Sequence, residues 1–125
     1  MAPEMKAATP LVNVLRASLR AERNPLCKAL DEVFGQCDLS QVEQCVREAC
    51  EKFKQDQSDD NDLTLHLANV LVTQFSNSAK ATERMAAHLV QGMLFKDVYE
   101  LQAIMEDIVY PMYLDPDDIR ASVLE

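Results

Sequence analysis

Residues 40–53, SQVEQCVREACEKF, carry the clearest structural signal in the chain. Their apolar side chains recur at positions i, i+3, i+4, i+7, i+8 and i+11, which lie on one face of an α-helix. The residues of that face are Val42, Cys45, Val46, Ala49, Cys50 and Phe53. Ser40 and Glu43 have the spacing of a capping box, so we expect the helix to begin at Ser40.

Further helix start signals occur on both sides of this segment. Thr9-Pro10 and Asn24-Pro25 each join a capping side chain to a proline, a residue that suits the first turn of a helix. Asp115-Pro116 repeats this pattern, and Asp97-Val-Tyr-Glu100 resembles a capping box. With further starts near residues 62 and 78, the signals recur at the interval of one helix plus a short loop.

The apolar pattern after each start predicts which side chains face the core. For the first helix they are Leu11, Val12, Leu15 and Leu19, and for the second Leu26, Cys27, Leu30, Val33 and Phe34. For segment 81–95 they are Met85, Ala86, Leu89, Val90 and Met93, and for segment 97–110 Val98, Leu101, Ile104, Met105, Ile108 and Val109. Segment 63–75, LTLHLANVLVTQF, mixes a strand-like alternation with a helical period, and we predict a helix with an unusually wide apolar arc.

Glycine and proline predict where helices end. Gly35 is expected to close the second helix in the left-handed conformation, and Gly92 to weaken or end the helix of segment 81–95. Tyr110-Pro111 is expected to stop the helix that starts at Asp97, because the residue before a proline avoids the helical conformation. We therefore expect YPMYL, residues 110–114, to be a loop.

The chain contains 125 residues and two glycines, a scarcity that favours helices over hairpins and phosphate-binding loops. The sequence therefore predicts an all-α fold, a single domain of six to seven short antiparallel helices. Their rhythm resembles a HEAT-like stack of helical hairpins without a residue consensus, and a helical bundle is the alternative. We expect a flexible N-terminal tail at residues 1–8 and one domain at 9–125, with an acidic loop at 55–62.

Cysteines and apolar runs bear on the location of the protein. Cys27, Cys37, Cys45 and Cys50 match no zinc-binding or thioredoxin spacing. The longest apolar runs are too short to cross a bilayer, and the N-terminus lacks the hydrophobic core of a signal peptide. We therefore expect reduced, mostly packed cysteines in an intracellular protein of the cytoplasm or nucleus that does not bind membranes.

The chain contains no phosphate-binding loop, HExxH or GxSxG motif, so we expect no enzymatic activity and no cofactor. Segment 56–62, DQSDDND, places Asp56, Ser58, Asp60 and Asp62 at ligand positions of a calcium loop, but Leu67 occupies the position of the closing glutamate. Two interpretations follow: a degenerate calcium-binding helical protein without a complete metal site, or an acidic solvated loop that caps the next helix.

Charge is distributed unevenly along the chain. The formal net charge is −9, yet residues 1–28 hold five basic and two acidic residues. Arg16, Arg20 and Arg23, the arginine stripe, are spaced to share one helix face, where guanidinium groups bind carboxylates or phosphates. The stripe fits surface salt bridges, an acidic protein segment or RNA, whereas so acidic a chain is a poor match for DNA.

A group of aromatic residues with one methionine lies near the C-terminal end. These residues are Phe95, Tyr99, Tyr110, Met112 and Tyr113, which we call the aromatic group. Core packing is the favoured role for most of these side chains, and the alternative is a protein interface, where tyrosine and methionine make adaptable contacts. We predict a non-enzymatic adaptor that binds a peptide or helix of a partner protein through the aromatic group and the arginine stripe. The alternative is an RNA-associated adaptor that contacts phosphate through the arginine stripe.

Overall fold

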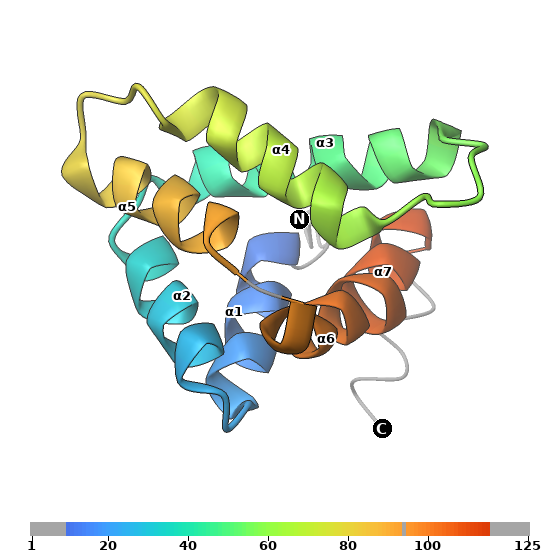
Figure 1. The fold of residues 1–125 in the computed structure, drawn as a ribbon, viewed down its shortest axis with the longest axis horizontal. Helices are drawn as coiled ribbons and strands as arrows, with labels where there is room; N and C mark the ends of the chain where they lie inside the picture. The colour runs from blue at the N-terminus through green and yellow to red at the C-terminus, as the bar shows by residue number, and fades with distance from the viewer. Residues whose placement is uncertain (1–9, 94, 116–125) are drawn as a thin grey trace, which may run out of the picture.

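The fold is entirely helical over the residues that the structure describes (Figure 1). The structure is a computed structural model, and it describes residues 10–93 and 95–115, with the backbone alone for residues 95–97. The helices are α1 (Leu11–Ala21), α2 (Pro25–Gly35), α3 (Leu39–Gln55), α4 (Leu63–Phe75), α5 (Ala81–Gln91) and α6 (Phe95–Ala103). A π-helical segment, η2 (Ile104–Val109), and a last helix, α7 (Tyr110–Leu114), continue directly from α6. The predicted all-α class is confirmed, whereas the tail at 1–8 and the helix expected from Pro116 lie outside the described residues.

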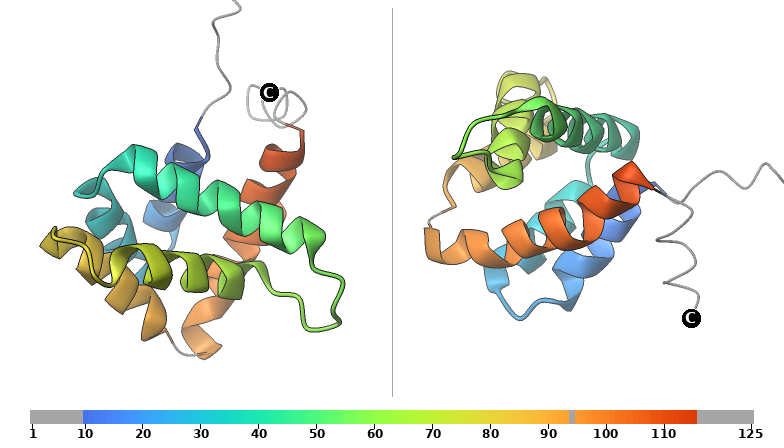
Figure 2. Two further views of the ribbon diagram at one scale, coloured as in Figure 1. Left: turned by 90° about the horizontal axis from the view of Figure 1, so that it is seen from above. Right: turned by 90° about the vertical axis from the view of Figure 1, so that its right-hand side faces the viewer.

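The helices are arranged in two layers. α3 and α4 lie side by side in one layer, and α1, α2 and the continuous helix from α6 to α7 form the other (Figures 1 and 2). α5 connects the layers, because it packs against both α4 and α2. The chain then returns through α6, which packs beside α4.

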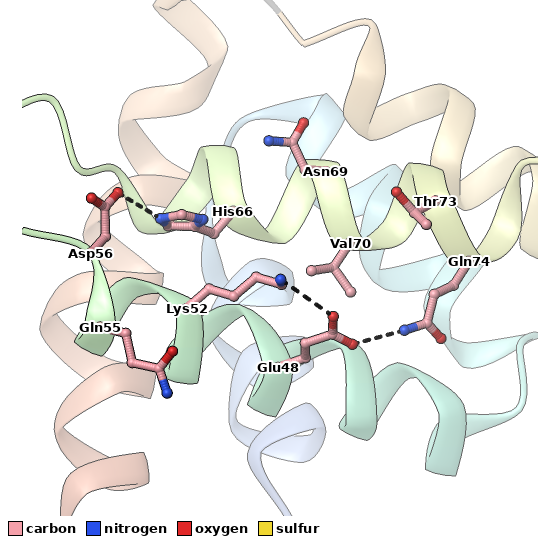
Figure 3. Close-up of a pocket in the computed structure, with 9 residues that line it drawn as sticks. All are labelled: Glu48, Lys52, Gln55, Asp56, His66, Asn69, Val70, Thr73 and Gln74. Carbon is pink, nitrogen blue, oxygen red and sulfur yellow. Dashed lines mark hydrogen bonds and ion pairs between the residues drawn. The ribbon is translucent and has the colours of Figure 1, made fainter. Parts of the chain in front are cut away.

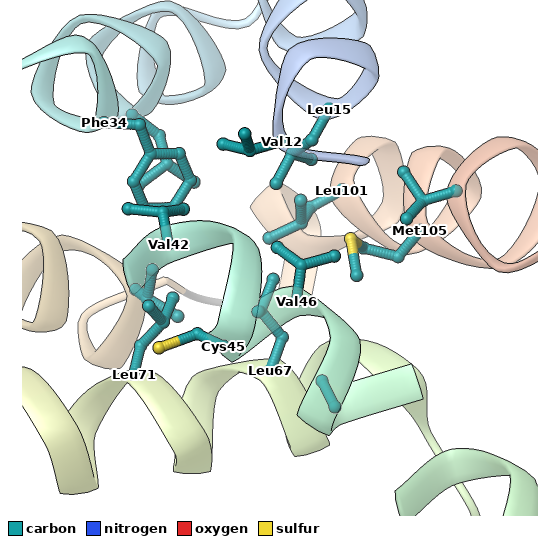
Figure 4. Packing of buried hydrophobic residues seen from close by; sticks show 14 of the residues in the cluster. Val12, Leu15, Phe34, Val42, Cys45, Val46, Leu67, Leu71, Leu101 and Met105 are labelled. Carbon is teal, nitrogen blue, oxygen red and sulfur yellow. The ribbon is translucent and has the colours of Figure 1, made fainter. Parts of the chain in front are cut away.

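The hydrophobic core lies between the two layers (Figure 4). Among the described residues its side chains come from all eight helical elements, and they include Val12, Leu15, Phe34, Val42, Val46, Leu67, Leu71, Leu101 and Met105. The inward faces predicted for α1 and α3 are buried, apart from Phe53, which is partly buried. Full burial of a leucine or phenylalanine side chain contributes about 1.5 to 3 kcal/mol, so this cluster is the main source of stability.

The N-terminus of α3 differs from the predicted capping box. Asp38, and not Ser40, is the capping residue, and its Oδ1 accepts a hydrogen bond from the Ser40 N–H at 3.0 Å. Glu43 instead extends to α1, where its carboxylate accepts from the N–H groups of Leu11 at 3.1 Å and Val12 at 2.7 Å. A carboxylate of α3 therefore caps α1, and the sequence spacing within α3 cannot reveal a contact of that range.

Gly35 is the last residue of α2 and does not adopt the predicted left-handed conformation. Neither glycine has a positive φ, and α2 is followed by Gln36 in the right-handed helical region. A Cβ on Gly35 would lie 2.5 Å from Nη2 of Arg16. The missing side chain therefore leaves room for the Arg16 guanidinium. Gly92, in contrast, ends α5 as predicted.

The helix does not stop at Tyr110-Pro111, and YPMYL forms α7 and not the predicted loop. The helix widens into η2 before the proline, where the Tyr110 N–H bonds the carbonyl of Met105, five residues back. Pro111 then lies in the first turn of α7, where its missing N–H is tolerated. The wider turn also rotates the helix face, so Ile108 is exposed although it was predicted to face inward.

α5 turns most of the predicted face to the core, with Ala87 buried in place of Met85. Met85 is 49% exposed, whereas Ala86 and Val90 are buried as predicted, together with Ala87. The two alanines are small enough to let α5 approach α2 and α4 closely. Which face of α5 is buried therefore depends on the neighbouring helices. α6 also differs, since it begins at Phe95 and not at the predicted capping box.

α4 is a helix, as predicted, despite the alternating leucines at its start. Asp62 caps it by accepting hydrogen bonds from the N–H groups of Thr64 at 2.9 Å and Leu65 at 3.3 Å. Glu106 of η2 accepts from the Leu63 N–H at 3.3 Å. Two carboxylates thus meet the positive end of the α4 dipole, and together they fix the helix start beside η2.

Replacing Glu43 with alanine removes the cap of α1. We expect E43A to lower the free energy of unfolding by about 1 to 2 kcal/mol, because two N–H groups at the start of α1 lose their acceptor. Urea denaturation followed by circular dichroism measures the change. E32A is the matched control, since Glu32 is an exposed glutamate in α2 whose side chain makes no hydrogen bond or ion pair among the described residues. Equal stability of E43A and E32A would contradict the capping role.

Candidate functional site

α4 carries a second apolar stripe beside its core-facing residues; Ala68 and Val72 are partly buried against the core, whereas Leu65 is exposed. Leu65, Ala68 and Val72 follow one another at i, i+3 and i+7, so they share one face of the helix. Leu65 is 57% exposed, whereas Leu67 and Leu71 on the neighbouring face are fully buried. The stripe of Leu65, Ala68 and Val72, called here the outer stripe, forms one wall of a groove of about 690 Å³.

The other walls of the groove come from α5 and α6. Val90 lies at the C-terminal end of α5 and Met93 two residues beyond that end, and Val98 and Tyr99 lie on α6. Tyr99 is 70% exposed. The polar residues of the lining are Asp62, Thr64, Asn69, Gln91 and Gln102. The groove is therefore a mostly apolar surface between three helices, with an exposed leucine and an exposed tyrosine on opposite walls.

The aromatic group does not form one surface. The side chain of Phe95 lies outside the described part of the chain. Of the other four residues, Tyr99 lines the groove, Met112 is buried, and Tyr110 and Tyr113 are partly buried against the core. The structure thus brings Tyr99 together with the outer stripe and separates it from the residues of α7.

Tyr110 and Tyr113 hold α7 against α3. The Tyr110 ring meets Phe53 edge to face with 4.8 Å between the ring centroids, and it stacks on Tyr113 at 6.4 Å. The Tyr113 hydroxyl donates a hydrogen bond to the Glu51 carboxylate. That bond raises the pKa of Tyr113 to about 12 and lowers the pKa of Glu51. These contacts within the chain occupy much of the aromatic group that we predicted to bind a partner.

Two residues of the arginine stripe are bound to Asp31 of α2. Nε of Arg16 donates to Asp31 Oδ1 at 2.9 Å, and Nε of Arg20 donates to Oδ2 at 3.2 Å. Burial raises the pKa of Asp31, but the hydrogen bonds and charges of Arg20 and Arg16 outweigh it and leave this pKa below its ordinary value of 3.8. Arg23 is exposed and lies beyond the end of α1, so it does not extend the helix face that carries the other two.

A polar cleft of about 500 Å³ lies between α3 and α4 (Figure 3). Its side chains are largely paired with one another. Glu48 lies 3.9 Å from Nζ of Lys52 and accepts a hydrogen bond from Gln74 at 2.9 Å. Nε2 of His66 lies 3.2 Å from Asp56 and 2.9 Å from the side-chain oxygen of Asn61. These pairs link the two helices across the cleft and tie the acidic loop to α4.

The calcium-loop hypothesis gave ligand roles to four residues of the 56–62 connection. Oδ1 of Asp56 accepts a hydrogen bond from the Ser58 hydroxyl at 2.6 Å. Asp62 caps α4, and Leu67, at the position of the closing glutamate, is fully buried in the core. Within the described residues, no three His, Cys, Asp or Glu side chains are grouped so that they could hold a metal ion. The connection has the geometry of an acidic loop that caps the following helix.

All four cysteines are buried and free of disulfides. Burial raises the pKa of Cys45 and of Cys50 to about 12 each. These thiols are therefore protonated at neutral pH, where a thiol is a poor nucleophile. The prediction that most of the cysteines pack as small apolar residues is confirmed.

Comparisons with known proteins give no indication of the function. The sequence matches no protein-family model, no curated protein and no solved structure. The helices within residues 10–93 and 95–115 are all too short or too polar to span a membrane.

Sequence reasoning did not identify the outer stripe as part of a site. The signal was present as the wide apolar arc of segment 63–75, which exceeds what one core-facing stripe needs. A wide apolar arc is also typical of a fully buried helix, so periodicity alone does not mark the outer stripe as exposed. The position of α6 decides this, because α6 packs beside α4 and leaves Leu65 exposed.

Asp31 provides a pH-dependent test of the arginine pairing. We expect D31N to lower the free energy of unfolding by about 2 kcal/mol near neutral pH, because Arg16 and Arg20 lose a buried charged acceptor. The pKa of Asp31 in the folded chain lies below 3.8. The contribution of its ion pairs to the free energy of unfolding is therefore complete above that value and disappears as the pH falls through the folded pKa. Urea unfolding at neutral and strongly acidic pH should show the difference between wild type and D31N narrowing in acid. A difference that stays constant with pH would rule out this ion pair as its source.

Proposed function

We propose that this chain is a non-enzymatic protein-interaction domain that binds an amphipathic helix of a partner protein in the groove between α4, α5 and α6. The observation that supports this most is the exposure of two large side chains toward one concave surface. Leu65 is 57% exposed and Tyr99 is 70% exposed, and both line the groove. Large apolar side chains that flank a groove are typical of sites for partner segments.

The shape of the groove favours a helix as the occupant. Its walls are mostly helical, and the outer stripe spans eight residues of α4, from Leu65 to Val72, which is about 10 Å along the helix axis. A partner helix of two to three turns matches that length and presents apolar residues at i, i+3 or i+4, and i+7. Leu65, Met93 and Tyr99 then act as the main contacts, because each of them is large and at least partly accessible.

The lining of the groove suits binding better than catalysis. Asp62 and Tyr99 are its ionisable residues, and the Asp62 carboxylate accepts hydrogen bonds from the start of α4. A site of this composition offers apolar contact and a few hydrogen bonds, but no paired acid and base. We retain the expectation of a protein that works without a cofactor. We also retain the expectation of an intracellular protein, which the four buried thiols support.

The arrangement of neighbouring helices supports the hairpin form of the predicted fold. α1 packs on α2 and α3 packs on α4, so consecutive helices pair in space. We propose that the domain is a short stack of such helical hairpins, with the groove formed where α6 meets α4. The arginine stripe plays a smaller part in this proposal than the sequence suggested, because Asp31 holds Arg16 and Arg20. For the same reason the RNA alternative gains no support from the stripe.

Selection from a displayed library of helical peptides about 18 residues long, roughly 27 Å when helical, tests the proposed function. Peptides that bind the wild-type chain are measured again against L65E and M85E by fluorescence anisotropy. We expect L65E to weaken binding by about a hundredfold, because a carboxylate then interrupts the apolar wall. M85E is the matched control, since Met85 is 49% exposed on α5 but does not line the groove.

Both variants should keep the wild-type circular dichroism spectrum, because both positions are exposed. If every selected peptide binds L65E as well as it binds the wild type, the groove is not the binding site and the proposed function is wrong.

A further inference from the structure

One end of the groove is surrounded by carboxylates. Asp62 lines the groove at the start of α4, and none of the lining residues that the structure describes is basic. The connection that leads into Asp62 is DQSDDND, which holds four aspartates and no basic residue. Glu106 reaches the same end from η2, because it accepts a hydrogen bond from the Leu63 N–H.

These carboxylates fall into two groups with different surroundings. Asp62 and Glu106 accept hydrogen bonds from the first N–H groups of α4, so the helix terminus offsets part of their charge. Asp59 and Asp60 are exposed, and their side chains make no hydrogen bond or ion pair among the described residues. These two aspartates, which the described part of the chain leaves unpaired, precede the groove-lining Asp62 by three and two residues.

Net charge distinguishes among the segments that could occupy an apolar groove. A second copy of this chain brings a net charge of −9 to a surface that is already acidic. The chain's own segment 116–125, PDDIRASVLE, holds three acidic residues and one basic residue. Like charges oppose both of these occupants, whereas lysine or arginine on a partner finds unpaired acceptors.

We infer that the partner that binds the groove is a basic amphipathic helix, an inference that rests on the proposed function. Its apolar face lies on the outer stripe and Tyr99, and its lysine or arginine residues lie toward Asp59 and Asp60. The apolar contacts supply most of the affinity, while the charges orient the helix and raise the association rate. Binding therefore weakens with salt more strongly than for a neutral helix of the same apolar face.

The peptide library tests this inference when its solvent-facing positions vary among lysine, glutamate and glutamine. Groove-dependent peptides are those that bind the wild type and are lost with L65E. We expect them to carry a net positive charge. The decisive variant is D59N/D60N, because both residues are exposed and make no side-chain bond that folding needs. E22Q/E32Q is the matched control, since it changes the net charge equally at residues that do not line the groove.

We expect D59N/D60N to lower the affinity for a lysine-rich, groove-dependent peptide about tenfold at low ionic strength, and E22Q/E32Q to change it less than about twofold. The effect of D59N/D60N should shrink between about 50 mM and about 500 mM NaCl. Groove-dependent peptides that are neutral or acidic would overturn the inference and leave the proposed function standing, as would equal effects of the two double variants. If the selection yields no groove-dependent peptide, the proposed function itself fails.

Discussion

The packing of α4 is the constraint on which the rest of the structure depends. This helix carries more apolar surface than a single core face can bury. Leu63, Leu67, Leu71 and Phe75 face the core and are buried almost completely. The outer stripe of the same helix remains beside α6, with Leu65 exposed. One face of α4 therefore stabilises the fold, and the face next to it forms the groove that we assign to a partner.

Carboxylate side chains fix the positions of the helices that pack around α4. Glu43 of α3 caps α1, and Glu106 of η2 joins the local cap Asp62 at the start of α4, so two contacts between distant segments end at backbone N–H groups. Asp31 holds two arginines of α1 against α2 in the same way. Much of the acidic character of the chain thus has a structural role. The carboxylates without such a role include Asp59 and Asp60, in the connection that leads to the groove-lining Asp62.

The sequence predicts those features that depend on residues close together in the chain. The buried faces of α1 and α3 follow from periodicity, and Asn24 caps α2 as its spacing with Pro25 predicts. Features that depend on distant residues were predicted wrongly. Glu43 has the spacing of a local cap but bonds α1, and Gly35 is next to an arginine of α1 and needs no unusual φ.

The candidate site shows the same division between local and distant information. The wide apolar arc of α4 was visible in the sequence, but its exposed part depends on where α6 lies. Tyr99 was chosen correctly as a residue outside the inward face of its helix, and the structure places it on the groove. The tyrosines of α7 were separated from it because the π-helical turn carries the helix past Pro111 and onto α3. Local signals do not specify that turn, since its wider hydrogen-bonding pattern is set by packing on both sides.

The division of α4 into a folding face and a binding face is tested most directly by comparing L67A with L65A in urea denaturation. The two residues are neighbours on one helix and undergo the same chemical change. We expect L67A to lower the free energy of unfolding by about 3 kcal/mol, because Leu67 is fully buried, and L65A to change it by less than about 0.5 kcal/mol. A loss for L65A comparable to that of L67A would show that the outer stripe belongs to the core, and it would contradict the assignment of the groove to a partner.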